Sequence, residues 1–514
     1  MRKLTRRDFL RLAALTPAGL SLSSVLKDTS ANTNSLNIII LIFDSLSAAN
    51  MSLYGYPRKT TPNIEKFAEN SLIFHSHYSA GSYTTPGSAS LLTGLYPWTH
   101  RAIRFDSAIL PRFVKNNIFH EMSSAYNRIA FTQNLLAEIH LDSFHQDIEN
   151  HLSPAAFSVV HYMLGDKLRN DPLEGNRALD LFLLAGDPPQ SLLLGTAEKL
   201  ISQYDASHLI DADLYPFGIP NANDGRVRFV LSDVLEGLDA TLAGLKEPFI
   251  AYLHLYPPHW PYAPRKEYGN LFNDNWSPGA KPWHDLGDHT SEKDLIADRV
   301  LYDRYVANVD SDFGKFHEAL QKTGLLDRSY LFLTSDHGEL FERGVFGHVS
   351  PLLYEAGIRV PLVVSAPGQG TRQDVDSVTN SVDILPTVLS LTGHDVPAWA
   401  EGELLPALGG EDIPSRSTYS FDAKNSSKFG DLPIFTMALR KDRYKLIYYQ
   451  GYKDYKDYKP NKKENKYEVG TFELYDIQSD PDELDDLADS EPTIAKSMLD
   501  ELLLKYHSVN RPVH

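Results

Sequence analysis

The chain has 514 residues, 42% of them hydrophobic and 23% charged, which is enough for one large and one smaller domain with a substantial buried core. It contains no cysteine, and this excludes disulfides, thiolate metal sites and cysteine nucleophiles. The formal net charge of −18 disfavours nucleic acid and anionic membrane surfaces as partners, although solubility alone explains much of the acidity. An anionic substrate would therefore need local attraction from a metal or a cluster of donors.

Residues 1–31 predict an export signal. A basic stretch is followed over residues 12–26 by apolar and small side chains, a run too short to span a membrane comfortably. The pair Arg6 and Arg7 stands just ahead of an aromatic-leucine pair, which resembles a twin-arginine signal. The alternative is the start of an amphipathic helix that happens to carry two arginines. Cleavage near Ala31 would release the rest of the chain.

This signal predicts an exported protein, periplasmic or extracellular, with the twin-arginine export machinery as a partner. No later stretch of the sequence reaches transmembrane length, so we expect no stable membrane anchor after cleavage.

Residues 36–410 are expected to form a single α/β domain that carries the catalytic site. The apolar run at 38–43 is typical of a strand buried on both faces. Further strands are expected at 249–256, 330–333 and 360–364, and helices at 61–70, 86–95, 295–325 and 383–391. Because strands alternate with helices, the sheet should be mostly parallel. Residues 140–240 have weak periodicity, and we interpret them as an insertion that could cap a site.

Residues 411–514 predict a small α+β subdomain. Two short adjacent strands are expected at 435–439 and 444–449, and a C-terminal helix at 491–506. The lysine- and tyrosine-rich run between them, 452–466, is typical of an exposed hairpin or loop.

Candidate metal ligands follow two of the predicted strands. Asp44 comes directly after the first strand, and Asp336 and His337 come after the strand at 330–333. In a parallel α/β sheet the carboxyl ends of the strands form the site, and this residue set suits a hard or borderline metal. The alternatives are that Asp44 only caps a helix and that the other two residues only bind nearby backbone.

A hydroxyl at the start of a predicted helix is a candidate nucleophile. Thr84 lies just ahead of Pro86, where free N–H groups and the positive end of the helix dipole favour anions. A threonine oxygen bound to a divalent metal loses its proton more easily. The alternative is that Thr84 is only an N-cap. His259 and His348 lie in loops, where a lone histidine is usually solvated or hydrogen-bonded.

The order and spacing of these motifs resemble the sulfatase family of the alkaline phosphatase superfamily. The segments that carry the resemblance are Asp44, 54–56, 61–63, 89–97, 335–339, 358–362, 382–387 and 473–483. The resemblance implies an alkaline-phosphatase-like three-layer fold and an enzyme that hydrolyses sulfuric or phosphoric esters. It also places Asp44, Thr84, Asp336 and His337 on the metal, makes Thr84 the nucleophile, and gives His259 and His348 to the ester oxyanion or the leaving group.

The chain departs from the family pattern at the nucleophile. Sulfatases have the motif Cys- or Ser-x-Pro-x-Arg at this place, and its first residue is converted to formylglycine. Residues 84–88 instead read Thr-Thr-Pro-Gly-Ser, so no aldehyde can form and Ser88 stands in the place of arginine. Gln133 and Asn134 lie where many sulfatases have lysine and histidine, and we expect them to bind the substrate as neutral donors.

The expected cofactor is one divalent metal or more. Zinc or manganese is favoured because imidazole from His337 suits these ions, while Ser45 after Asp44 weakens a calcium site without excluding it.

These residues predict hydrolysis of a small-molecule or glycan ester through a covalent Thr84 intermediate. A phosphate mono- or diester is favoured over sulfate, because a sulfo-threonine lacks the elimination route of a formylglycine hydrate. Two alternatives remain: a transferase that moves a phosphoryl headgroup onto an alcohol, and an inactive protein that binds acidic or sulfated glycans.

Overall fold

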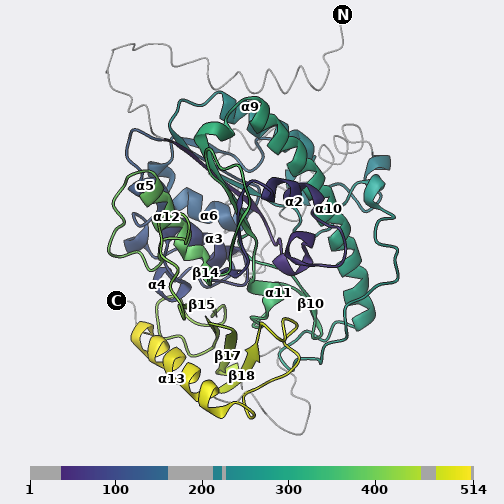
Figure 1. Cartoon of the computed structure of the whole chain (residues 1–514), viewed down its shortest axis with the longest axis vertical. Coiled ribbons are helices and arrows are strands. Elements are labelled where there is room, and N and C mark those ends of the chain that lie inside the picture. The colour runs from purple at the N-terminus through teal and green to yellow at the C-terminus, as the bar shows by residue number, and fades with distance from the viewer. Residues whose placement is uncertain (1–35, 160–211, 223–226, 453–469, 511–514) are drawn as a thin grey trace, which may run out of the picture.

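The computed structural model describes residues 36–159, 212–222, 227–452 and 470–510, so the predicted signal at 1–31 lies outside the described residues (Figure 1). Its central element is an eight-stranded sheet in the order β13-β2-β12-β9-β1-β8-β4-β5. The strands are β1 Asn37–Phe43, β2 Leu72–Phe74, β4 Asn127–Thr132, β5 Asn150–Leu152, β8 Phe249–Leu255, β9 Ser329–Thr334, β12 Leu362–Ser365 and β13 Gln373–Val375.

The sheet is mostly parallel, as the sequence predicts. The central strand β1 pairs in parallel with β8 and β9, and every one of its seven residues is buried. Only β12 runs antiparallel to its neighbours β9 and β2. A strand buried on both faces must be apolar throughout, which explains the continuous run of isoleucine and leucine in β1.

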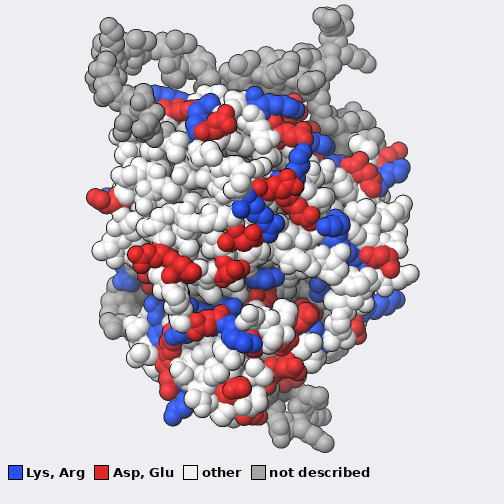
Figure 2. All heavy atoms as spheres, in the orientation of Figure 1, with Lys and Arg blue, Asp and Glu red and all other residues white. Residues whose placement is uncertain are grey.

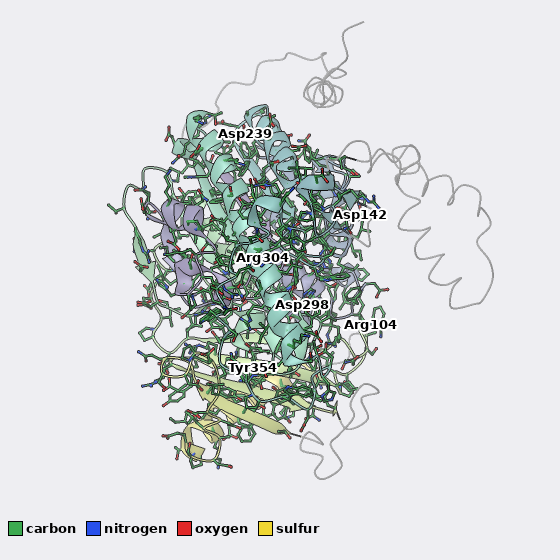
Figure 3. The ribbon with its side chains drawn as sticks, turned by 90° about the vertical axis from the view of Figure 1, so that its right-hand side faces the viewer. Arg104, Asp142, Asp239, Asp298, Arg304 and Tyr354 are labelled. Atoms are coloured by element: carbon green, nitrogen blue, oxygen red, sulfur yellow. The ribbon has the colours of Figure 1, made fainter. Side chains whose placement is uncertain are left out.

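Helices cover both faces of the sheet. One face packs against α2 Pro62–Ala68, α9 Leu231–Ala243 and α10 Glu292–Lys322, and the other against α3 Thr84–Thr93, α5 Ile118–Glu121, α6 Leu135–Ser143 and α12 Ile384–Leu391. Within β1, Ile39 and Leu41 point to the first layer, and Ile40 and Ile42 to the second. This arrangement confirms the three-layer α/β fold. Figure 3 shows Asp298 and Arg304 along α10, on the outside of its layer.

Shorter elements connect these layers. They are β3 His77–Tyr78, α4 Pro97–His100, β6 Asn221–Ala222, β7 Val227–Arg228, β10 Leu340–Glu342, β11 Val345–Gly347, α11 Glu355–Ile358 and β14 Thr379–Asn380. Strands β10 and β11 form an antiparallel hairpin, and β3 pairs in parallel with β14.

Both ends of the stretch 140–240 belong to the central fold. Strand β5 is an edge strand of the main sheet, and α9 packs on that sheet through Val234 and Leu238. The weak periodicity of this stretch concealed these elements, and our interpretation of all of it as an insertion was too broad. Only the residues between β5 and α9 could still form the predicted cap. Of these, 160–211 and 223–226 lie outside the described residues.

A second, antiparallel sheet forms the C-terminal part. It has the order β15-β16-β17-β18, with bounds Ser417–Asp422, Phe435–Lys441, Tyr444–Gln450 and Thr471–Asp476. Helix α13, Pro492–Val509, packs on it through Met498 and Leu502 (yellow in Figure 1). The sequence predicted β16, β17 and α13 but not β15 and β18. The predicted loop at 452–466 lies, after Tyr452, outside the described residues.

On the face seen in Figure 2, acidic and basic side chains are interspersed rather than gathered by sign. Among the helices in the described residues, none is both long and apolar enough to cross a membrane.

Candidate active site

Three parallel strands bring the candidate metal ligands to one edge of the sheet. In register, Ile42 of β1 lies between His254 of β8 and Thr334 of β9, so the residues just beyond these positions emerge together. His337 Nε2 lies 3.4 Å from Asp44 Oδ1 and 3.4 Å from Asp336 Oδ2. One potential ligand atom from each of these three residues lies within 4.8 Å of the others, and all three are buried. The arrangement is the one that the strand-end pattern predicted.

The electrostatics of this cluster fit a bound cation. Asp44 and Asp336 are fully buried side by side, and Asp336 Oδ2 has no hydrogen-bond partner. A buried carboxylate without a partner is costly, and a divalent ion would remove that cost. Burial lowers the pKa of His337, but the Asp336 and Asp44 carboxylates outweigh it and raise the value to about 9. For Asp44, burial alone would raise the pKa, yet the nearby histidines hold the pKa of this carboxyl well below its usual value.

Thr84 is the first residue of α3 and faces the same cluster. The N-cap is Tyr83, whose side chain makes no capping bond, so Thr84 is not the cap. Thr84 Oγ1 lies 3.3 Å from His337 Nε2 and accepts a hydrogen bond from Asn134 Nδ2 at 3.1 Å. Ser88, in the place of the family's arginine, donates to the Thr84 carbonyl at 2.5 Å. The hydroxyl therefore lies at the positive end of a helix, beside the two buried carboxylates.

Gly87 allows the first turn of α3 to approach the loop after β9. A Cβ at this position would lie 2.3 Å from the carbonyl oxygen of Asp336, closer than atoms tolerate. The same carbonyl accepts a hydrogen bond from Ser79 Oγ at 2.5 Å. The close packing explains why glycine follows the proline in this turn.

The structure separates the roles of Asn134 and Gln133. Asn134 caps α6 through its side-chain oxygen, and its Nδ2 donates to Asp44 Oδ2 at 2.6 Å as well as to Thr84. Gln133 Oε1 accepts from the Tyr256 N–H at 3.1 Å, which ties it to the loop after β8. Asn134 is thus in the cluster itself, while the hydrogen bond between Gln133 and Tyr256 supports the loop that leads to His259.

His259 and His348 lie at the more open side of the cluster. Both are partly exposed, their ring centroids are 4.8 Å apart, and the ring of His348 is 4.2 Å from that of His337. His348 Nδ1 is hydrogen-bonded to Glu339 Oε1 at 2.9 Å. Burial lowers the pKa of both rings, that of His348 to about 3.

Sequence reasoning missed His254. This residue is fully buried in β8, with Nε2 3.3 Å from Asp44 Oδ2 and 3.7 Å from Asp336 Oδ2, while Nδ1 is hydrogen-bonded to the Tyr252 hydroxyl at 3.2 Å. The available signal was a histidine near the carboxyl end of an otherwise apolar strand. Tyr302 was missed too: its hydroxyl donates to Ser45 O at 2.6 Å and holds the turn after Asp44.

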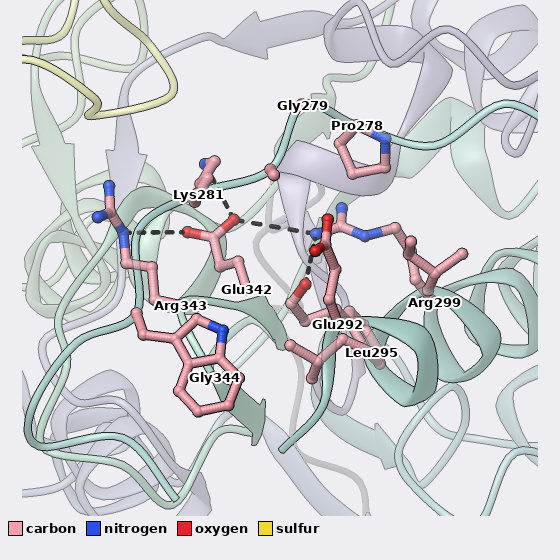
Figure 4. Close-up of a pocket in the computed structure, with 13 residues that line it drawn as sticks. Pro278, Gly279, Lys281, Glu292, Leu295, Arg299, Glu342, Arg343 and Gly344 are labelled. Carbon is pink, nitrogen blue, oxygen red and sulfur yellow. Dashed lines mark hydrogen bonds and ion pairs between the residues drawn. The ribbon is translucent and has the colours of Figure 1, made fainter. Parts of the chain in front are cut away.

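A separate hollow lies away from these residues. It is lined by the loop at 278–283, the start of α10 and the β10–β11 hairpin (Figure 4). Its central carboxylate, Glu342, is paired with Lys281 at 2.9 Å and lies 3.9 Å from both Arg299 and Arg343. These charges are matched within the protein, and none of the predicted site residues lines the hollow.

Comparison with known proteins agrees with the geometry. The family model described as Sulfatase matches residues 36–394, and that described as N-sulphoglucosamine sulphohydrolase, C-terminal, matches residues 342–508. The chain belongs to the sulfatase family. The Sulfatase match includes the whole eight-stranded sheet and the residues Asp44, Asp336 and His337.

Individual relatives are distant. Arylsulfatase K of Bos taurus is 29% identical over 52% of this chain and 53% of its own, so the match spans about half of that relative. Choline-sulfatase of Rhizobium meliloti (strain 1021) is 22% identical over 88% of this chain and 82% of its own. Among solved structures, the phosphonate monoester hydrolase of Agrobacterium radiobacter has a TM-score of 0.65 at 17% identity, covering 93% of this chain and 96% of the other. The similarity to this hydrolase structure shows that the two chains share a fold.

Proposed function

We propose that this protein is a metal-dependent hydrolase that cleaves a phosphate or sulfate ester through a covalent intermediate on Thr84, with phosphate mono- or diesters favoured. One observation carries the proposal. Thr84 Oγ1 lies at the N-terminus of α3, within 3.3 Å of His337 and 3.1 Å of Asn134, beside two buried carboxylates. A positive helix end and metal-type ligands beside a hydroxyl favour its deprotonated, nucleophilic form.

Asp44, Asp336, His337 and Thr84 would hold the divalent ion. The mixed oxygen and imidazole donors favour zinc or manganese over calcium, although calcium also binds carboxylates. When bound, such an ion lowers the pKa of a nearby hydroxyl and neutralises the charge that develops on the ester oxygens.

The protein's own groups account for the rest of the reaction. The Thr84 hydroxyl releases its proton to solvent, its oxygen attacks the phosphorus or sulfur in line with the leaving oxygen, and the bond from that atom to the leaving oxygen breaks. A proton from His259 or His348 goes to the leaving oxygen, since the anionic ester favours the charged form of a neighbouring imidazole. Water then releases the group from Thr84. Asn134 binds a substrate oxygen, with Gln133 supporting it as a second neutral donor.

Relatives indicate the kind of substrate. Their names include an arylsulfatase, a choline-sulfatase and a phosphonate monoester hydrolase, and a structure similar in fold was solved with D-glucosamine-2-N,6-O-disulfate. These names support a small-molecule or glycan ester as the substrate class.

The test combines metal analysis with turnover. Purified protein and its Thr84→Ala variant would be assayed with 4-nitrophenyl phosphate, bis(4-nitrophenyl) phosphate and 4-nitrophenyl sulfate. We expect a bound divalent metal, turnover of at least one ester, and a loss of kcat of about a thousandfold in the variant. Thr93→Ala is the matched control, because Thr93 lies at the far end of the same helix.

Acid quenching during turnover should leave a phosphoryl or sulfuryl group on the peptide that contains Thr84. Bound metal with an inactive wild type would support the glycan-binding alternative, and transfer to an added alcohol in place of water would support the transferase. A metal-free protein whose activity survives Thr84→Ala would refute the proposal.

We also propose export through residues 1–31 to the periplasm or the cell exterior. The basic stretch and the Arg6-Arg7 pair support this. Replacing both arginines with lysine should retain the protein in the cytoplasm, and an unchanged distribution would contradict a twin-arginine signal.

A further inference from the structure

A second group of metal-type side chains lies where helix α6 meets the edge strand of the main sheet. Glu138 and Asp142 are four residues apart on α6, and His151 is in β5 (Asp142 is labelled in Figure 3). One potential ligand atom from each of the three residues lies within 4.8 Å of the others. Among the described residues, only this group and the three ligands of the candidate active site come so close together.

Helix α6 separates the two groups. Asn134 caps the start of the helix beside Thr84, whereas Asp142 lies in its last turn. Eight residues of α-helix rise about 12 Å, so an ion bound at one end would share no ligand with an ion bound at the other. Glu138 is buried, His151 is partly exposed and Asp142 is exposed, so the second group is open to ions from solvent.

The imidazole of His151 faces the whole carboxylate group of Glu138. Its Nε2 lies 3.1 Å from each of the two carboxylate oxygens. Two ligand atoms that are each about 2.1 Å from a tetrahedral ion lie about 3.4 Å apart, so these side chains need to move little to share one. Their backbones are fixed, because His151 pairs with Ala130 of β4 and Glu138 is inside a helix.

The two carboxylates on α6 are poorly placed without a cation. Residues four apart on a helix are neighbours, and like charges at this spacing repel each other. Asp142 also lies in the last turn, where the negative end of the helix dipole disfavours a further negative charge. A divalent ion between Glu138 and Asp142 would offset both effects.

We propose that Glu138, Asp142 and His151 form a second metal site, which binds a zinc ion with water as the fourth ligand. Two carboxylates and an imidazole are donors that zinc accepts, and three protein ligands with one water complete its four-coordinate geometry. The ion joins α6 to β5 and so has a structural role. This site does not depend on the ester-hydrolase function proposed above.

The experiment counts the zinc ions that the full chain binds. The protein would carry no histidine tag and would be freed of metal with a chelator. The parent is Asp336→Asn, in which the active-site group has lost a ligand. Zinc would be titrated calorimetrically, and Co2+ would report the coordination by its visible absorption. The variants added to this parent are His151→Gln, Glu138→Gln, Asp142→Asn and His120→Gln.

His120→Gln is the matched control. His120 Nδ1 lies 2.9 Å from Asp147 Oδ1, so this histidine also faces a carboxylate. The pair belongs to neither of the two groups of three found among the described residues. Loss of a histidine as such is therefore separated from loss of the site.

We expect the parent to bind one zinc ion per chain and to give the Co2+ spectrum of a four-coordinate site. His151→Gln and Glu138→Gln should remove this ion or weaken its binding at least about tenfold, and His120→Gln should change neither the count nor the affinity. Zinc should also raise the thermal unfolding midpoint of the parent, because an ion that binds the folded state stabilises it. His151→Gln should lose this rise.

The proposal is overturned if the parent binds no zinc, or if His151→Gln and Glu138→Gln bind it as tightly as the parent does. It is also overturned if His120→Gln weakens binding equally. Asp142 is exposed, so Asp142→Asn keeps the fold intact and gives the same comparison if either of the other substitutions prevents folding. Unchanged zinc binding in Asp142→Asn would then contradict the site.

Discussion

Two buried charged clusters in this protein differ in where their positive charge comes from. In the first, Lys445 is fully buried between two carboxylates, 3.1 Å from Glu355 and 2.7 Å from Glu483, and the Tyr78 hydroxyl donates to Glu355. In the second, Asp44 and Asp336 lie close together, and the basic side chains next to them are the histidines His254 and His337 rather than a lysine or arginine. A cluster that supplies its own cation stabilises the fold, whereas one that lacks it is suited to bind a cation from solution.

Removing a carboxylate from the second cluster is the strongest test of this difference. Asp336→Asn should abolish metal retention by this cluster and lower kcat about a thousandfold or more. In the metal-free state the substitution removes a buried carboxylate but also its attraction to the His337 ring, so we expect the free energy of unfolding to change by no more than about 1–3 kcal/mol. Metal analysis and urea unfolding measure the two effects, and a strongly destabilised apoprotein would contradict the comparison.

The first cluster should lose more stability when its cation is removed. Lys445→Met leaves Glu483 buried without its cation and Glu355 paired with Arg359 alone at 3.6 Å, and we expect a loss of about 3–5 kcal/mol in the free energy of unfolding. Lys441→Met is the control, since its ion pair with Glu501 is about one-third exposed and should contribute less than about 1 kcal/mol. Equal losses in the two variants would mean that burial of the pair does not matter.

Another buried carboxylate, Glu473, extends the comparison to pH. Burial alone would raise the pKa of Glu473, but His284 and the hydroxyl of Tyr354 outweigh it and lower the value to about 2 (Tyr354 is labelled in Figure 3). A carboxylate whose pKa is lower in the folded than in the unfolded state stabilises the fold at pH values above the unfolded pKa of about 4.5. This stabilisation is lost as the pH falls toward 2. Glu473→Gln should therefore cost about 3 kcal/mol at pH 7 and much less at pH 3, as measured by urea unfolding. A pH-independent difference would contradict this account.

The smallest expected effect concerns the orientation of His254. Tyr252→Phe removes the hydrogen bond to His254 Nδ1 and leaves the packing of the ring nearly unchanged. Side chains around a metal are held in orientation by the residues that hydrogen-bond them from behind. We therefore expect the metal affinity of the variant to fall about tenfold. Competition with a chelator measures this, and an unchanged affinity would show that His254 needs no such support.

The strand-end pattern was sufficient for the centre of the site. Asp44, Asp336 and His337 could be predicted because a parallel sheet gathers the residues that follow its strands, and neighbouring motifs added Thr84. The residue pattern alone did not decide whether Thr84 is a helix N-cap or a nucleophile. Its position as the first helical residue after Tyr83 depends on how α3 packs against the β9 loop, which Gly87 permits.

Other residues gave too little signal. His254 lies inside a strand that otherwise reads as pure core, so its contact with Asp44 appears only once the strands are paired. The end of β15 lies beside the segment before Thr84 because β15 bonds to residues 79 and 80, a contact between distant segments with no local sequence pattern. The stretch 140–240 was misjudged for a similar reason, since α9 is amphipathic but stands between segments of weak periodicity.

Ser79 joins three parts of the molecule through one short residue. Its hydroxyl binds the carbonyl of Asp336, its carbonyl accepts from Ser420 of the C-terminal sheet, and its own chain continues to Thr84. Ser79 therefore connects the segment before Thr84, the loop after β9 and the second sheet. A shortened protein without residues beyond 411 would lose the hydrogen bond that holds Ser79 from the side of the second sheet, and with it part of the alignment between Thr84 and the loop that carries Asp336.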